Sequence, residues 1–234
     1  MRQFWKKMNV WYERLLLFVL TVVLLITSWC IYDSWYVYSH TLDDSILRYK
    51  PGAASAAEDE LPLTEDMVAW LTVDGTSIDY PVMQYTDNIK YLNTDPFGRY
   101  SLGGSIFLDS RSSADFSDDY SLIYGHHMEY GKMFGALDSF LNEDYLRSHK
   151  SGTLIIGKNN EKVYRLTIFA ALQASATEKV IFEPGQGDIR AYIRQHSDKT
   201  IIIPEGRIIA LSTCAEGNDD RRTLVFCSGS VPAA

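Results

Sequence analysis

The chain has 234 residues, of which 46% are hydrophobic, 22% charged and 13% aromatic. This composition excludes a disordered chain, a collagen-like chain and a coiled coil, and three cysteines are too few for a disulfide scaffold. The net charge is −8, and residues 1–40 hold four basic against two acidic side chains, so the acidity lies after residue 40. Because an acidic domain is repelled by phosphate backbones, we expect no nucleic-acid partner.

An uncharged apolar segment occupies residues 15–32. As a helix, these 18 residues would reach roughly 27 Å, close to the thickness of one hydrocarbon core. Basic residues precede the segment, so the positive-inside rule places the N-terminus in the cytoplasm and the chain after residue 33 outside. A cleaved signal peptide is the alternative, but no A-x-A-like site follows the apolar run. We therefore predict a cytoplasmic basic segment at 1–14 and a single-pass anchor in the cell membrane at 15–32.

Residues 33–60 connect this anchor to the folded part of the chain. Residues 33–50 have the pattern of a juxtamembrane helix, which Pro51 would end. Residues 52–60 read as a flexible, acidic linker. An extracellular domain is then expected at 61–234.

The domain has a mostly β pattern. Eight short runs rich in β-branched and aromatic residues are bounded by turn residues, at 68–73, 77–84, 106–109, 120–126, 152–157, 163–171, 207–214 and 222–226. Helices are predicted at 133–147 and 188–195. The spacing favours a mainly β fold, one antiparallel barrel or sandwich with inserted helices.

Cys214 stands at the end of an apolar strand and is followed by a polar loop. A thiol at such a junction can be held rigidly and still be reached, which suits a nucleophile. A buried small hydrophobe is one alternative, and a disulfide with Cys227 outside the cell is another. Strand parity argues against the disulfide, because Cys227 points away from Cys214 if Arg222 faces it.

His126 ends a strand, directly after Gly125, which leaves room for close approach of the backbone. A Cys and a His, each at a strand end, suggest a nucleophile and a base, and no carboxylate is obviously placed to make a triad. His127, the next residue, would point to the opposite face. Arg222 begins the strand after the Cys214 loop, so antiparallel strands return it to the level of Cys214, where a guanidinium can donate to a developing oxyanion.

Arg221 is the rival of Arg222, although strand parity aims it away from the site. The motif His126-His127 with nearby Asp residues has no recognised metal-ligand spacing. We therefore expect no metal, and the acidic residues Asp115, Asp118 and Asp119 are read as a solvated loop rather than as a calcium site.

These residues resemble the sortase family of Gram-positive bacteria. Residues 211–214 (LSTC) look like the TLxTC signature of that family, with Ala210 at its first position, and the family's His and Arg stand as His126 and Arg222 do. Further segments resemble class B sortases in particular, namely 79–82 (DYPV), 104–109 (GSIFLD), 123–128 (IYGHHM), 133–135 (MFG) and the helix predicted at 188–195. The resemblance covers residues 61–229 and the anchor.

The resemblance implies an eight-stranded sortase-type β-barrel and a cysteine transpeptidase that needs no cofactor. Cys214 would attack the Thr carbonyl of a C-terminal sorting signal in a secreted protein. His126 would protonate the leaving amine and deprotonate the incoming one, and Arg222 would stabilise the oxyanion. By similarity, Tyr124 and Ser212 would contact the peptide. The acyl group would pass to a peptidoglycan precursor amine or to a pilin lysine.

Several alternatives stay open from the sequence. The signal is of the NPQTN or the LPxTG type, and the reactive thiolate–imidazolium pair is either a minority form or a papain-like ion pair. An extracellular cysteine peptidase would use the same residues and pass the acyl group to water. A non-catalytic, membrane-tethered binding module would keep its function when Cys214 is replaced by Ala.

Overall fold

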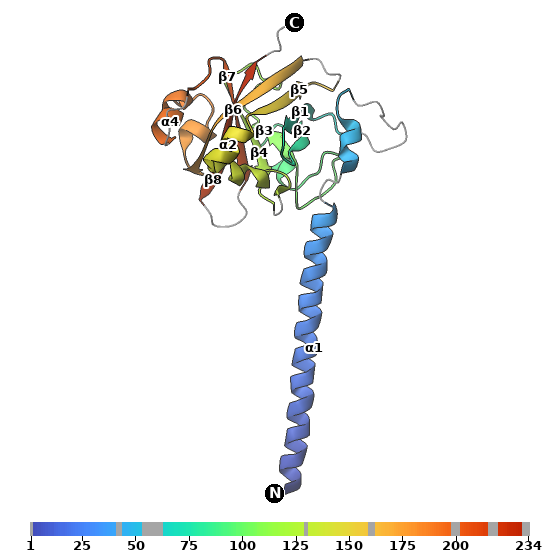
Figure 1. Cartoon of the computed structure of the whole chain (residues 1–234). Helices are drawn as coiled ribbons and strands as arrows, with labels where there is room; N and C mark the ends of the chain where they lie inside the picture. The colour runs from blue at the N-terminus through green and yellow to red at the C-terminus, as the bar shows by residue number, and fades with distance from the viewer. Residues whose placement is uncertain are drawn as a thin grey trace. The chain divides into compact units, whose positions relative to one another are not determined.

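The computed structural model describes residues 2–40, 44–52, 63–128, 131–158, 162–197, 202–214 and 220–230. The chain divides into two units, Met1–Asp43 and Asp44–Ala234 (Figure 1). The predicted linker falls almost entirely on residues 53–62, which lie outside the described residues.

The first unit is one long helix, α1 (Arg2–His40). Its part from Met8 to Trp35 is long and apolar enough to cross a membrane, and none of it is buried within the protein. The predicted anchor at 15–32 lies inside this part. The helix predicted at 33–50 is not a separate element: α1 continues to His40, and the 3-10 helix η1 (Asp44–Tyr49) follows in the second unit.

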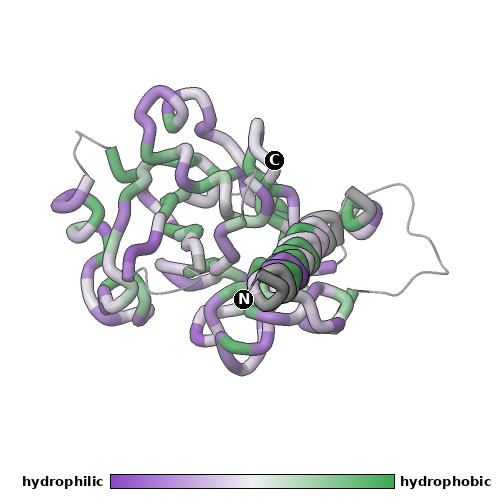
Figure 2. The backbone as a smooth tube through the Cα atoms, turned by 90° about the horizontal axis from the view of Figure 1, so that it is seen from below, coloured by the Kyte–Doolittle hydropathy of each residue, from purple (hydrophilic) through white to green (hydrophobic). Residues whose placement is uncertain are grey.

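The second unit is a β-barrel with helices on its outside (Figure 1). Within the described residues its strands are β1 (Met67–Val73), β2 (Asp79–Met83), β3 (Ile106–Leu108), β4 (Tyr120–His126), β5 (Ser151–Ile156), β6 (Lys162–Ser175), β7 (Arg207–Cys214) and β8 (Arg221–Ser230). They close in the order β1-β2-β3-β4-β7-β8-β6-β5. The predicted eight-stranded barrel is confirmed. Figure 2 shows hydrophilic residues along the connecting segments at its periphery.

The expectation that the barrel is antiparallel is wrong at two pairs of neighbouring strands. β2 and β3 run parallel, and so do β4 and β7. Parallel neighbours need a long crossover connection rather than a hairpin turn, and here β5, β6 and all the intervening helices stand between β4 and β7. The β4–β7 pair extends over seven residues of each strand, from Tyr120↔Ile208 to His126↔Cys214.

The single helix predicted at 133–147 is also wrong. The chain forms the 3-10 helix η4 (Gly135–Leu141) and then the separate helix α2 (Glu143–Ser148). Asn142 causes the break, because its side chain accepts hydrogen bonds from the backbone N–H groups of Asp144 and Tyr145 and so starts a new helix.

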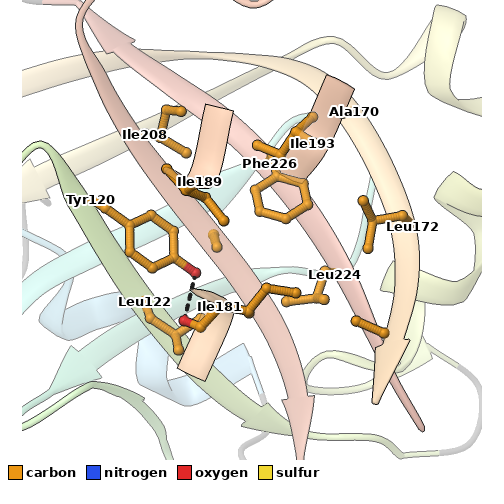
Figure 3. Close-up of a cluster of buried hydrophobic side chains, with 12 residues drawn as sticks. Tyr120, Leu122, Ala170, Leu172, Ile181, Ile189, Ile193, Ile208, Leu224 and Phe226 are labelled. Atoms are coloured by element: carbon orange, nitrogen blue, oxygen red, sulfur yellow. Dashed lines mark hydrogen bonds between the residues drawn. The ribbon is translucent and has the colours of Figure 1, made fainter. Parts of the chain in front are cut away.

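Two further helices lie between β6 and β7. α3 (Lys179–Phe182) was not predicted, whereas α4 (Ile189–His196) agrees with the helix predicted at 188–195. Both contribute to a buried apolar cluster on the outer face of β4, β6, β7 and β8 (Figure 3). Its members are Tyr120, Leu122, Ala170, Leu172, Ala174, Ile181, Ile189, Ile193, Ile208, Ala210, Leu224 and Phe226. The strand members alternate along each strand, so one face of the wall is buried under the helices.

Candidate active site

The parallel pairing of β4 with β7 brings together four of the five predicted site residues. Tyr124 is the partner of Ser212, and His126 is the partner of Cys214. Paired residues of adjacent strands stand at the same level and on the same face of a sheet. These four residues lie on the same face of β4 and β7 as the apolar cluster, two to four residues further along each strand.

Arg222, the fifth residue, lies on the neighbouring strand β8. The antiparallel register pairs Ser212 with Leu224, so two residues further along each strand position 222 comes level with position 214. Because alternate residues share a face, Arg222 lies on the face of Leu224, and Arg221 belongs to the opposite one. Arg222 is half-buried and Arg221 is exposed.

His126 is held by a backbone carbonyl. Its Nε2 lies 2.6 Å from the carbonyl oxygen of Leu92, the last residue of the short 3-10 helix η2 (Lys90–Leu92). A carbonyl only accepts hydrogen bonds, so Nε2 carries a proton whether the ring is neutral or charged. Nδ1 is buried and has no hydrogen-bond partner among the described residues. Nδ1 is therefore the nitrogen that can take up and release a proton.

The end of β4 is fixed by close packing against the segment that leads into η4. A Cβ on Gly125 would stand 2.7 Å from the ring of Phe134, so the close approach predicted at this glycine is that of Phe134. The Phe134 N–H donates to the His126 carbonyl over 3.0 Å. A Cβ on Gly135 would meet the Met128 carbonyl oxygen at 1.9 Å. The backbone around His126 therefore has little room to move.

Tyr124 is oriented by a buried carboxylate that the sequence did not single out. Its hydroxyl donates to Asp109 Oδ2 over 3.1 Å, and the Asp109 side chain is fully buried. Arg111 donates to both carboxylate oxygens of Asp109, over 2.9 and 2.8 Å. Arg111 also donates to the Phe182 carbonyl at the end of α3. Asp109 thus connects the site to the helices beside it.

The charge state of Asp109 follows from these contacts. Burial alone would raise the pKa of its carboxyl group, but hydrogen bonds from the Arg111 side chain and backbone, with the charge of Arg111, outweigh burial and hold that pKa below its usual range. Asp109 is therefore ionised at neutral pH. In the sequence, only its position at the end of segment 104–109, which resembles class B sortases, pointed to Asp109.

Ser212 is fully buried, and within the described residues its hydroxyl donates a long 3.3 Å hydrogen bond to the Thr213 carbonyl. The alternative disulfide is excluded, because Cys227 is a free, buried thiol that pairs with Ile209, five residues before Cys214 on β7. Burial raises the pKa of the Cys227 thiol to about 12, so this cysteine stays protonated and unreactive.

The comparisons with known proteins agree with this architecture. The sortase domain family matches residues 71–229. Sortase B of Listeria monocytogenes is 32% identical over 230 residues, which cover 89% of this chain and 92% of that protein. Sortase B of Staphylococcus aureus is 31% identical over 163 residues, which cover 66% of this chain and 65% of that protein.

Solved structures give the same result. A class B sortase of Streptococcus pyogenes has a TM-score of 0.64 and 33% identity, over 81% of this chain and 98% of that one. The complex of Staphylococcus aureus sortase B with a substrate has a TM-score of 0.66 and 26% identity, over 73% and 82% of the two chains. The closed barrel and these matches define a cysteine transpeptidase of the class B type. The chain belongs to the sortase family.

Proposed function

We propose that Cys214, His126 and Arg222 are the catalytic residues and that they act on the C-terminal sorting signal of secreted proteins. The observation that carries this proposal is the register. It puts His126 beside Cys214 in one parallel pair and Arg222 level with Cys214 on the next strand. Cysteine nucleophiles are activated by a neighbouring base held in a fixed orientation, and the Leu92 carbonyl supplies that orientation here.

The reaction has two halves. The Cys214 thiolate attacks the carbonyl carbon of the signal's Thr residue, and the oxyanion that forms accepts hydrogen bonds from the Arg222 guanidinium. The intermediate collapses, the C–N bond breaks, and the protonated Nδ1 of His126 gives its proton to the leaving amine. The incoming amine then attacks the thioester, Nδ1 takes its proton, and the thiolate leaves as the new amide forms.

Tyr124 and Ser212 border the proposed peptide groove. Tyr124 is partly exposed, and its hydroxyl is fixed on Asp109, so its ring presents a rigid wall to a peptide. Ser212 is buried beside it on the next strand, and we propose that it shapes the floor of the groove.

The incoming amine belongs to a peptidoglycan precursor or to a pilin lysine. The Streptococcus pyogenes relative is involved in pilus biogenesis, and another sortase B structure is a complex with triglycine. Sortases are cell-surface enzymes, and α1 is suited to be the anchor. We propose a single-pass orientation with residues 1–14 in the cytoplasm, 15–32 in the membrane, 33–60 as the connection and 61–234 outside.

The test uses the full chain in detergent with fluorogenic NPQTN-type and LPxTG-type peptides. Each is incubated with triglycine, with an α-blocked lysine amine or with no amine, and the products are weighed by mass spectrometry. We expect an amine-joined product that Cys214→Ala abolishes and that Cys30→Ala, a change of the exposed thiol on α1, leaves intact. Hydrolysis in spite of excess amine would favour the peptidase, and an active Cys214→Ala variant would overturn the assignment.

A further inference from the structure

Each of the three proposed catalytic residues has a sequence neighbour whose side chain joins one hydrogen-bonded network behind the site. The neighbours are His127, Thr213 and Thr223, and the network centres on Asp138 of η4. Because successive residues of a strand alternate between faces, these neighbours lie on the reverse side of the wall from the site. None of the four was assigned a role by the family resemblance.

Asp138 binds two of these neighbours through its two carboxylate oxygens. Oδ1 accepts a 2.6 Å hydrogen bond from the Thr223 hydroxyl. Oδ2 lies 2.8 Å from Nε2 of His127, which donates to it. Thr223 is in turn tied to the third neighbour, because its backbone N–H donates to the Thr213 hydroxyl over 3.2 Å.

The network stands where the regular pairing of β7 with β8 stops. The last paired residues are Ser212 and Leu224. Beyond them, the bond from the Thr223 N–H to the Thr213 side chain takes the place of a ladder hydrogen bond. Thr213 and Thr223 are only 5% and 4% exposed, so this bond is shielded from water. The two strand ends that carry Cys214 and Arg222 are therefore joined by a hydrogen bond from the backbone of β8 to a side chain of β7.

The same carboxylate reaches β4. His127 directly follows His126 and forms an isolated β-bridge with Met133, just before η4. Asp138 therefore connects the end of β4 with the start of β8, across the end of β7. These are the three strand ends that carry His126, Arg222 and Cys214.

We propose that Asp138 is a positioning residue, which sets the spacing of Cys214, His126 and Arg222 from behind the barrel wall. This proposal rests on the proposed function. The Asp138 side chain is 49% exposed and that of His127 44%, and such exposed polar contacts add little to folding stability. The effect of Asp138 therefore falls on the rate of reaction, because a displacement of about 1 Å can cost a rate factor on the order of 100.

The test measures kcat, KM and the melting temperature of the full chain with the peptide that the wild type cleaves. The variants are Asp138→Ala, Thr223→Val and Thr223→Ser, and the matched control is Ser139→Ala, at the exposed residue next to Asp138 in η4. We expect Asp138→Ala and Thr223→Val to lower kcat roughly 10-fold with KM changed by less than about 2-fold. Thr223→Ser keeps the hydroxyl and restores kcat, and Ser139→Ala behaves as the wild type.

A double variant makes the test sharper. Asp138→Ala and Thr223→Val break the same hydrogen bond, so together they lower kcat no further than the more harmful of the two alone. Unchanged kcat in both single variants, fully additive effects or a Thr223→Ser variant as slow as Thr223→Val would each overturn the network proposal. A wild-type chain that forms no acyl adduct at Cys214 would instead overturn the proposed function on which this proposal rests.

Discussion

One face of the barrel wall, formed by β4, β7 and β8, has two ends that differ in what covers them. At one end Tyr120, Ile208 and Phe226 are buried in the cluster to which α3 and α4 contribute (Figure 3). At the other end, on the same strands and the same face, His126 and Arg222 lie beyond the helices. The sequence changes along each strand from apolar to polar where the cover ends.

The difference shows how packing at one end of a strand can place the residues at its other end. Apolar burial fixes the register of a strand, since a slip by one residue would turn its apolar side chains outward. The polar residues a few positions further along the same strands are placed by this packing, and His126 is held in addition by the Leu92 carbonyl and by the fit of Gly125 against Phe134. The covered end, under α3 and α4, supplies stability, and the other end, which we call the open end, carries the partly exposed Tyr124 and Arg222 of the proposed site. Substitutions at the two ends should therefore change different quantities.

The largest expected contrast is between Phe226→Ala and Arg222→Ala, four residues apart on one face of β8. Phe226 is fully buried, so its loss should lower the free energy of unfolding by about 3–5 kcal/mol. Arg222→Ala should change that free energy by less than about 0.5 kcal/mol and lower kcat/KM roughly 100- to 1,000-fold, because a donor to the oxyanion is lost. Urea unfolding and peptide cleavage, both below the melting temperature, measure the two effects.

Two controls belong to this pair. Phe226→Leu should be less destabilising than Phe226→Ala, because it leaves a smaller cavity. Arg222→Lys should stay slow, because an ammonium group does not reproduce the fork of a guanidinium. A Phe226→Ala variant as stable as the wild type would contradict the role of the covered end in stability. An Arg222→Ala variant that cleaves normally would contradict the role of the other end in catalysis.

Asp109 connects the two ends, and it predicts a pH dependence. Asp109→Asn should lower the free energy of unfolding at pH 7 by about 2 kcal/mol, because Arg111 and Asn88 then lose hydrogen bonds to an ionised acceptor. The pKa of Asp109 is lower in the folded protein, so its contribution is present above the unfolded value of about 3.9 and is lost as the pH falls through the folded value. The difference between wild type and Asp109→Asn should therefore shrink between pH 7 and pH 3.

Urea unfolding at both pH values measures this difference. Asp119→Asn, at an exposed carboxylate on the same β3–β4 connection, serves as the control and should match the wild type. An Asp109→Asn difference of the same size at pH 3 and pH 7 would show that the carboxylate charge contributes nothing.

The strands could be predicted because they depend on local patterns, whereas the five site positions were proposed from strand ends together with motifs that resemble the sortase family. Alternation fixes which residues of a strand share a face, and this was enough to prefer Arg222 over Arg221 and to doubt a Cys214–Cys227 disulfide. The parallel pairing of β4 with β7 could not be predicted in the same way. The two strands are separated by about 80 residues, and a local sequence pattern does not show which distant strand β4 pairs with.

The groups that orient the site were missed for a related reason. Leu92 acts through its backbone carbonyl, which every residue type has, so the sequence could not single it out. Asp138 sits in a segment that was predicted as one continuous helix, whereas it lies in the 3-10 helix η4, which ends before Asn142. Asp109 acts by way of Tyr124, a contact between two strands that only the folded register creates.

The smallest expected effect compares two tyrosines of β4 on the same face. Tyr120, at the covered end, donates to the Ile181 carbonyl of α3 over 3.0 Å. Tyr120→Phe leaves that buried carbonyl without this donor and should lower the free energy of unfolding by about 1 kcal/mol, with unchanged cleavage.

Tyr124→Phe, at the open end, removes a hydroxyl from a carboxylate that keeps its bonds to Arg111 and Asn88. Its unfolding free energy should therefore change by less than about 0.5 kcal/mol, whereas KM should rise because the ring that borders the groove is no longer fixed. The same loss of one hydroxyl then reports on stability at one end of the strand and on substrate binding at the other. If both changes raised KM equally, the prediction would be wrong. The contact of Tyr120 with α3 would then support the groove as much as the contact of Tyr124 with Asp109 does.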